Sequence, residues 1–139
     1  MKLIPVYGNK SVEPTLWRLM VERSKEDDPF MPWAERKLPT KEAYFKDVRQ
    51  RKYHRFFVIK VGRKHVGVIL VQKNNEVGVI LFPKYRSTGY GKEALELLLD
   101  EENPISGGHF RARIHPHNVR SIRMVESLGF LHRYNIYEL

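Results

Sequence analysis

The 139-residue sequence contains no cysteine, no low-complexity tract and no long uninterrupted hydrophobic run. Without cysteine there is no disulfide framework, no thiolate metal site and no cysteine nucleophile. The opening residues MKLIPVYGNK place a charge within their apolar stretch and are too short in apolar length for a signal peptide or a membrane span. We therefore expect a cytoplasmic protein with no membrane partner.

In the first half of the chain the acidic residues are too few to balance the basic ones, which outnumber them two to one. Residues 1–70 hold 16 Lys and Arg against 8 Asp and Glu, whereas residues 71–139 hold 9 against 8. The surplus gives a formal net charge of +9 and peaks in the segment 46–55. Such a basic surface attracts phosphates, anionic metabolites or nucleic acid, and a solvated face that maintains solubility explains the charge equally well.

The pattern of apolar residues predicts a single domain of mixed strands and helices. With 42% hydrophobic residues the chain can bury an ordinary core. A strand-helix-strand crossover in its second half implies one parallel pair inside an otherwise antiparallel sheet. The expected elements are a short opening strand, helices over 13–25 and after the N-cap Thr40, a hairpin over 55–72, a strand over 76–82, a helix ending near 103–104, a strand over 109–115, a helix over 118–128 closed by Gly129, and a final strand.

Two glycines and an arginine stand where the strand over 76–82 gives way to a helix, in the sequence RSTGYG of residues 86–91. Glycines at a helix N-terminus let the backbone turn its N–H groups outward at the positive end of the helix dipole, which suits a phosphate or pyrophosphate. The pattern has too few glycines for a dinucleotide fingerprint and lacks the Lys-Ser/Thr of a nucleotide P-loop. The pattern therefore matches neither of these nucleotide sites, and its alternatives are another kind of phosphate site or a helix start alone.

The stretch VGVILFPKYRSTGYGKEALELLL resembles the acetyl-CoA motif of the GNAT superfamily of N-acetyltransferases, and ARIHPHNVRSIRMVESLGF is similar to that superfamily's second motif. The pattern is closest to the group that acetylates ribosomal-protein N-termini. The resemblance implies an α/β chain of the α+β type with the GNAT fold: one domain over 1–139 with a central mixed, mostly antiparallel sheet of about six strands, one splayed parallel pair and four flanking helices. Residues 1–70 would form the acceptor side and residues 71–139 the acetyl-CoA side.

The same resemblance implies acetyl-CoA as co-substrate, an amine as acceptor and no metal. Backbone N–H groups of the RxxGxG loop would hold the pyrophosphate, and the Leu81 N–H would donate to the thioester oxygen, where it stabilises charge that develops in the transition state. Asn118 matches an asparagine that faces the pantetheine arm. The residues expected to bind the cofactor are Ile80, Leu81, Arg86, Ser87, Thr88, Gly89, Tyr90, Gly91, Lys92, Asn118 and Ser121.

Acetyl transfer also needs a base, because an amine with a pKa of about 10 is mostly protonated at neutral pH. Glu76 occupies a position where some relatives carry a glutamate base, and its alternative is a solvated charge at the end of a loop. The usual tyrosine acid is replaced by Val125, and Ser121 matches a serine that some relatives use instead. The alternative for Ser121 is a capping role alone. Tyr85 and Tyr134 are further hydroxyls that the sequence does not rank.

The acceptor side includes the loop KEDDPFMPWAER of residues 25–36. Phe30, Met31 and Trp33 are expected to contact the substrate as an apolar wall, and the alternative is that Phe30 and Trp33 fill the core. Acidic neighbours would receive the cationic amine, namely Asp27, Asp28 and Glu35. The basic surplus disfavours a free polyamine or aminoglycoside and favours a peptide N-terminus, a phosphorylated or nucleotide-linked amine, or an aminoacyl-tRNA.

Three further interpretations concern metal, catalysis and assembly. His115 and His117 are expected to be loop residues and not ligands, because the chain has no cysteine and no helical histidine spacing; His54 and His65 flank the hairpin and could face the acceptor. A catalytically inactive GNAT-fold module that binds nucleic acid or an acidic partner is the competing hypothesis, which Val125 favours and the intact motif residues disfavour. The short stretch after the second motif leaves no room for the usual closing hairpin, which suggests a homodimer.

Overall fold

A four-stranded antiparallel sheet forms the centre of the computed structural model, which describes residues 1–26 and 38–133. Neighbouring strands follow one another in chain order, and each pairs antiparallel with the next. Their bounds are β1 Lys2–Pro5, β2 Arg55–Val61, β3 Lys64–Val71 and β4 Val77–Leu81. The hairpin predicted over 55–72 is therefore confirmed as β2 and β3.

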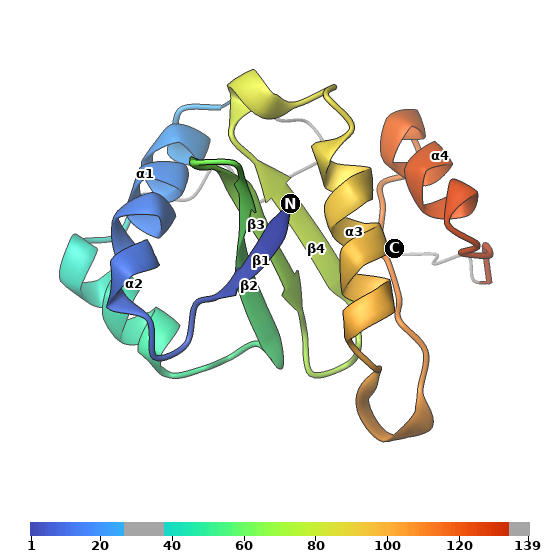
Figure 1. The fold of residues 1–139 in the computed structure, drawn as a ribbon, viewed down its shortest axis with the longest axis horizontal. Coiled ribbons are helices and arrows are strands. Elements are labelled where there is room, and N and C mark those ends of the chain that lie inside the picture. Colours follow the sequence, from blue (N-terminus) through green and yellow to red (C-terminus); the bar gives the residue numbers. More distant parts are fainter. Residues whose placement is uncertain (27–37, 134–139) are drawn as a thin grey trace, which may run out of the picture.

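Helices cover both faces of this sheet, two on each side (Figure 1). One face carries α1 and α2, and the other carries α3 with α4 beside it (Figure 1). Short 3-10 turns precede α1, α3 and α4. The bounds are α1 Glu13–Ser24, α2 Lys41–Arg49, α3 Tyr90–Glu101 and α4 Val119–Ser127.

The helices begin and end close to where the sequence predicts. Thr40 caps α2, because its hydroxyl oxygen accepts from the Ala43 N–H at 3.2 Å. Asn118 caps α4 in the same way through the Ser121 N–H at 3.4 Å. Gly129 follows α4 with φ of 93°, a left-handed conformation that glycine adopts without strain.

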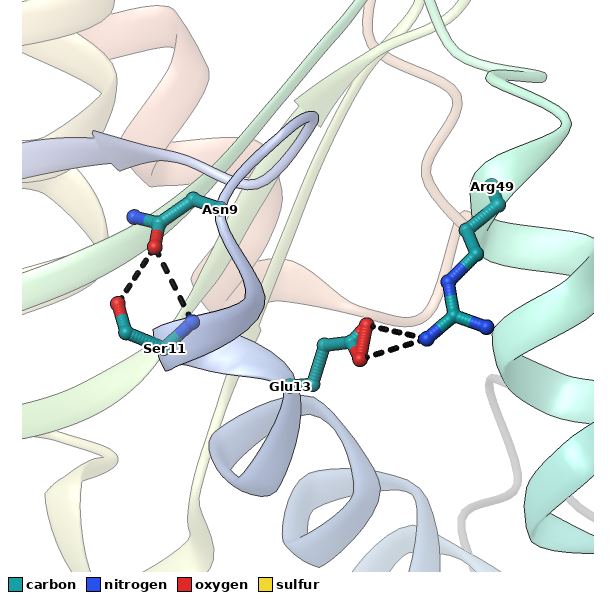
Figure 2. A network of polar contacts seen from close by, with 4 residues as sticks. All are labelled: Asn9, Ser11, Glu13 and Arg49. Atoms are coloured by element: carbon teal, nitrogen blue, oxygen red, sulfur yellow. Dashed lines mark hydrogen bonds and ion pairs between the residues drawn. The ribbon is translucent and has the colours of Figure 1, made fainter.

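The first and second helices are joined by polar contacts at their ends (Figure 2). Both carboxylate oxygens of Glu13, the first residue of α1, accept from one guanidinium nitrogen of Arg49, the last residue of α2, at 2.9 and 3.0 Å. Before them the Asn9 side-chain oxygen accepts from the Ser11 N–H at 3.2 Å and from the Ser11 hydroxyl at 2.5 Å. The Glu13–Arg49 pair joins α2 to the start of α1, and the Asn9 contacts stabilise the turn that precedes α1.

Apolar side chains alternate between the two faces and build a core on each. The α1-face core contains Val58, Val68 and Leu16, and the α3-face core contains Ile69 and Leu95 with other buried aliphatic residues. All five side chains are at most 3% exposed. Two cores on opposite sides of one sheet hold the strands in a fixed register, so the edge of β4 has a defined position.

A bulge interrupts the pairing of β2 with β3. Ile59 pairs with Gly67 while Lys60 pairs with His65, so Val66 is the extra residue. A Cβ added to Gly67 would lie 2.2 Å from the Ile80 carbonyl oxygen, and only glycine therefore lets β4 approach this closely. The bulge and the glycine together place the C-terminal end of β4.

The described residues hold four strands, where about six are expected. Among the described residues, the segment 109–115, predicted as a strand, pairs only through a parallel bridge between Glu76 and Arg111. The Val77 N–H donates to the Arg111 carbonyl at 2.8 Å and the Arg111 N–H donates to the Asn75 carbonyl at 2.9 Å, after which the two segments no longer pair. The parallel contact and the fold class are confirmed, and within the described residues this segment forms a single bridge and not a longer ladder. Residues 131–133 have no regular structure, and the rest of the last predicted strand lies outside the described residues.

Candidate active site

The loop between β4 and α3 has the backbone conformation that the RxxGxG pattern predicts. A 3-10 turn, Pro83–Tyr85, leads into it, and both Ser87 and Gly89 have positive φ, 64° and 85°. Gly89 is the N-cap of α3 and its missing side chain removes the strain of this conformation. The Thr88 hydroxyl donates to the Tyr85 carbonyl at 2.5 Å and so closes the loop on itself.

This loop presents a row of free donors at the start of α3. Tyr90 has only a long contact, from its N–H to the Thr88 hydroxyl at 3.5 Å. The first turn of a helix leaves its N–H groups without intrahelical acceptors, and the helix dipole adds partial positive charge there. In the described part of the chain no acceptor pairs with the N–H groups of Ser87, Thr88, Gly89, Gly91 and Lys92.

The outer edge of β4 carries a second set of free backbone donors. The Phe82 N–H donates to the Val66 carbonyl on β3 at 3.0 Å, whereas the Val77 N–H points the other way, to Arg111. Because backbone groups alternate sides along a strand, Val79 and Leu81 direct theirs to the same outer edge as Val77. Past Arg111 no described segment pairs with this edge.

Ile80 directs its backbone groups to β3, and Val79 directs its backbone groups to the free edge. Ile80 pairs with Val68 on β3, and its side chain packs in the α1-face core. Leu81 keeps its expected place: its N–H lies on the free edge, while its carbonyl accepts from Arg86 at 3.2 Å. The sequence does not show Val79, because the side to which a strand residue points depends on pairing and not on residue type.

The Arg86 side chain stabilises the loop through hydrogen bonds to Glu26 and Leu81. One of its guanidinium nitrogens donates to both carboxylate oxygens of Glu26, at 2.8 and 2.9 Å, as well as to the Leu81 carbonyl. Its backbone N–H donates to the Pro83 carbonyl at 3.2 Å. Arg86 therefore links the end of β4 to the residues that follow α1, and the free donors of the loop come from the residues after it.

The start of α4 lies against the same loop. An Arg120 guanidinium nitrogen donates to the Ser87 hydroxyl, which places a cation beside the row of free N–H groups. A Cβ added to Gly91 would lie 3.7 Å from Leu81 and 3.8 Å from the Met124 sulfur, so β4, α3 and α4 meet there. Sequence analysis missed Arg120, although a basic residue in the first turn of a helix, where acidic residues are favoured, is a usable signal.

Ser121 lies one helical turn before Met124, on the face of α4 that meets Gly91. It is half-buried, and its N–H is the group that Asn118 caps. Its hydroxyl has no hydrogen-bond partner among the residues that the structure describes. The capping role that the sequence leaves open therefore belongs to the side chain of Asn118, and the hydroxyl of Ser121 is free for another partner.

Glu76 is not brought together with Leu81. The two residues lie at opposite ends of β4, five positions or about 17 Å apart at the rise of an extended strand. The Glu76 carboxylate is paired with Arg113 at 3.2 Å, and its side chain is 16% exposed. Because of this ion pair and its low exposure, Glu76 is also not the open, solvated charge of the alternative interpretation.

Other predicted site residues give a mixed outcome. Val125 is buried in the α3-face core at 8% exposure, so no acid stands at that position. The Tyr85 ring packs 6.3 Å from the Tyr90 ring, centroid to centroid, at the base of the loop. Tyr134 and the predicted substrate residues of 27–37, Phe30, Met31 and Trp33, lie outside the described residues.

His65 is the histidine whose environment is most distinctive. Its ring Nδ1 lies 2.5 Å from the hydroxyl of Thr15, a side chain of α1 that is only 5% exposed. Burial, and to a lesser extent the positive charges of Lys60 and Arg18, lower the pKa of His65 below its usual value. His65 therefore remains neutral at physiological pH.

His115 and His117 form a local pair. The His117 N–H donates to the His115 Nδ1 at 3.1 Å, and the rings are 5.4 Å apart. Across residues 1–26 and 38–133 no group of three or more His, Asp or Glu side chains is arranged to hold a metal ion. The helices in these residues include none long and apolar enough to cross a membrane.

Solved structures with this fold share the arrangement of helices and sheet. A ribosomal-protein-alanine N-acetyltransferase from Brucella melitensis has a TM-score of 0.73 at 18% identity, with 93% of this chain and 83% of that chain covered. A domain from Methanocaldococcus jannaschii has a TM-score of 0.71 at 22% identity over 99% and 93%. A spermidine N-acetyltransferase from Vibrio cholerae, in complex with CoA and spermine, has a TM-score of 0.68 at 17% identity over 96% and 82%. At these identities the likeness shows the fold.

A search of curated proteins found no match to the chain. The family model of the acetyltransferase (GNAT) domain, however, matches residues 12–131, which is most of the chain. This match, the loop of free donors and the unpaired edge of β4 agree with one another. The chain belongs to the GNAT acetyltransferase family.

Proposed function

We propose that the protein transfers an acetyl group from acetyl-CoA directly to a primary amine within a ternary complex. The observation that carries this proposal is two neighbouring sets of free backbone donors, one at Val79 and Leu81 on the outer edge of β4 and one from Ser87 to the first turn of α3. A nucleotide-linked thioester needs both sets: donors for a diphosphate and donors for an extended, amide-containing arm. The acceptor is a peptide N-terminus, an aminoacyl group or a small-molecule amine.

The diphosphate would bind at the N-terminus of α3. The free N–H groups there, together with the helix dipole, favour an anion, and Gly89 allows the close approach that a side chain would hinder. The Arg120 guanidinium, held by Ser87, adds a full positive charge at the rim of this site. Exposed Lys92, in the same turn of α3, adds a second cation.

The pantetheine arm would lie along the outer edge of β4. Its amide groups can pair with the backbone groups of Val79 much as a further strand would. The Leu81 N–H would then donate to the thioester oxygen, where negative charge develops as the amine attacks. Because the Leu81 carbonyl is already held by Arg86, the direction of this donor is set before the substrate binds.

The transfer forms a bond between the amine nitrogen and the acetyl carbon and breaks the bond between that carbon and sulfur. The acceptor must first lose a proton from its ammonium form, and the second nitrogen proton balances the departing thiolate. Ser121 lies one helical turn before Met124, which contacts the Gly91 position, and its hydroxyl has no partner in the described residues; both observations support a role in donating a proton to the thiolate. Glu76, paired with Arg113 at the far end of the strand, is too distant from Leu81 to act there without an intervening water chain.

The competing function is a binding module that has kept the fold and lost catalysis. The specific observation in its favour is Val125, a buried aliphatic side chain where many relatives have a tyrosine. Such a module would bind an anionic partner without any dependence on acetyl-CoA. The free backbone groups of Val79 and Leu81 on the edge of β4 would then have no pantetheine arm or thioester to bind, and this is why we favour the enzyme.

The test is an acetyl-transfer assay with the purified protein and acetyl-CoA. Thiol release would be followed over a panel of amines that includes peptides with free N-termini, and products would be identified by the mass of one added acetyl group. We expect amine-dependent thiol release that falls strongly in Ser121→Ala while acetyl-CoA affinity, measured by calorimetry, stays the same. Binding of acetyl-CoA without turnover of any amine would favour the module, and absence of acetyl-CoA binding would reject the proposal.

A further inference from the structure

A basic cleft adjoins the end of β4 on the α1 face. Its volume is about 410 Å³, within the range of small-ligand sites. One wall comes from α1 and another from the start of β3, and the third comes from Phe82 and the residues of the turn that leads into the RxxGxG loop. Since Phe82 directly follows Leu81, the cleft begins one residue beyond the proposed thioester donor.

The charges that line this cleft are predominantly positive. Four cationic side chains and a single carboxylate, that of Glu22, line the cleft. In the described residues none of the four makes an ion pair, whereas other arginines of the chain, such as Arg49 and Arg86, are paired. The four are Arg18, Arg63, Lys64 and Lys84.

Aromatic rings and a neutral histidine hold this arrangement in place. The Arg18 guanidinium lies 4.9 Å from the centre of the Phe82 ring, and the Lys84 ammonium lies 5.1 Å from that of Tyr85. His65 is fixed against α1 by Thr15 and offers a neutral ring at the cleft. Four cations from α1, the β2–β3 hairpin and the turn before the RxxGxG loop, without carboxylate partners among the described residues, suit a ligand that carries more than one negative charge.

We propose that this cleft binds the phosphate group of the acceptor, so that the substrate is a primary amine bearing a phosphate. A phosphate monoester carries close to two negative charges at neutral pH and three acceptor oxygens, which match unpaired Arg and Lys donors. The cleft is concave and bounded by α1, which suits a small molecule more than the long backbone of a nucleic acid. This inference rests on the proposed acetyl transfer, for which it specifies the class of acceptor.

The experiment uses two double variants that remove equal charge. Arg63→Gln with Lys84→Gln removes two exposed cations of the cleft, and Lys73→Gln with Arg133→Gln removes two exposed cations outside its lining. Binding of 2-aminoethyl phosphate, and of ethanolamine as the matched amine without phosphate, is measured by calorimetry. The titrations are made with saturating CoA, which occupies the diphosphate site and leaves the cleft as the place where added phosphate binds.

We expect 2-aminoethyl phosphate to bind the wild type and the control variant alike, with ethanolamine binding far more weakly. In the cleft variant its affinity should fall at least about tenfold, as expected for the loss of charged hydrogen bonds. The affinity for CoA should be equal in all three proteins. Turnover of 2-aminoethyl phosphate should follow the same order.

Four results would overturn the proposal. Equal weakening in both double variants would mean that net charge, and not the cleft, attracts the phosphate. A matching loss of CoA affinity in the cleft variant would make the cleft part of the cofactor site. Tighter, salt-dependent binding of an RNA oligonucleotide that depends on Arg63 and Lys84 would assign the cleft to nucleic acid. Unchanged affinity for 2-aminoethyl phosphate in the cleft variant would show that the cleft is not the phosphate site. Failure of the wild type to bind CoA would instead reject the proposed function itself.

Discussion

Replacing Gly89 by alanine tests the donor loop separately from the rest of the fold. A Cβ at this position would meet no atom within 4 Å, so the cost comes only from the φ of 85°. A left-handed conformation costs a non-glycine residue about 1–2 kcal/mol, which corresponds to a fall of roughly 3–10 °C in the melting temperature for a chain of this length. If the backbone relaxes instead, the N–H groups of Tyr90 and Gly91 turn away from the diphosphate.

Thermal unfolding with and without acetyl-CoA measures both effects. A ligand at one hundred times its Kd adds about 2.7 kcal/mol to the stability of the folded state, and a tenfold loss of affinity reduces this to about 1.4 kcal/mol at the same concentration. We therefore expect the shift produced by acetyl-CoA to fall to about half in Gly89→Ala.

Gly91→Ala is the matched control, because its Cβ would make only ordinary contacts, at 3.7–3.8 Å, with Leu81, Val79 and Met124. It should keep the full ligand-induced shift and gain up to about 1 kcal/mol in stability from the better helix former. A wild-type shift in Gly89→Ala, or loss of the shift in Gly91→Ala alone, would refute the assignment of the loop.

The remaining predictions concern the sheet, the histidine and the arginine beside the loop. Gly67→Ala should cost about 3 kcal/mol or more in denaturant unfolding, because its Cβ would collide with the Ile80 carbonyl oxygen and separate β3 from β4. The lowered pKa of His65 means that the unfolded state binds more protons below about pH 6.5, so stability should fall on acidification, and His65→Gln should flatten this dependence in melting curves recorded from pH 7.5 to 5. Arg120→Ala should weaken acetyl-CoA about tenfold by calorimetry without lowering the melting temperature of the free protein, because its contact with Ser87 is exposed; an unchanged affinity would remove Arg120 from the site.

Local signals in the sequence identify the helix ends and the loop. The caps Thr40 and Asn118 and the left-handed Gly89 each satisfy a local backbone requirement, and each stands where it was expected. The strand predicted over 109–115, in contrast, depends on pairing and not on a local backbone requirement. Its alternation records which side chains are half-buried, whereas a strand also needs a partner for its backbone, and no described segment pairs with it beyond Arg111.

The parts of the site that the sequence does not show depend on distant pairing. Val79 lies on the free edge and Ile80 pairs with β3 because the register with β3 decides which backbone groups reach that edge. The contact of Arg120 with Ser87 joins residues 33 positions apart and depends on how α4 packs. The pair of Thr15 with His65 spans 50 positions and depends on α1 lying across the start of β3.

The extra residue in β3 also determines on which face of the sheet the His65 side chain lies. Without the bulge at Val66, the two-residue alternation that sends Ile69 to the α3-face core would send His65 there as well. The bulge reverses this phase, and His65 reaches Thr15 on the opposite side. The gain or loss of one residue at the hairpin tip would therefore change which side chain lies at the cleft. The strands that carry the core and the β4 edge would keep their pairing.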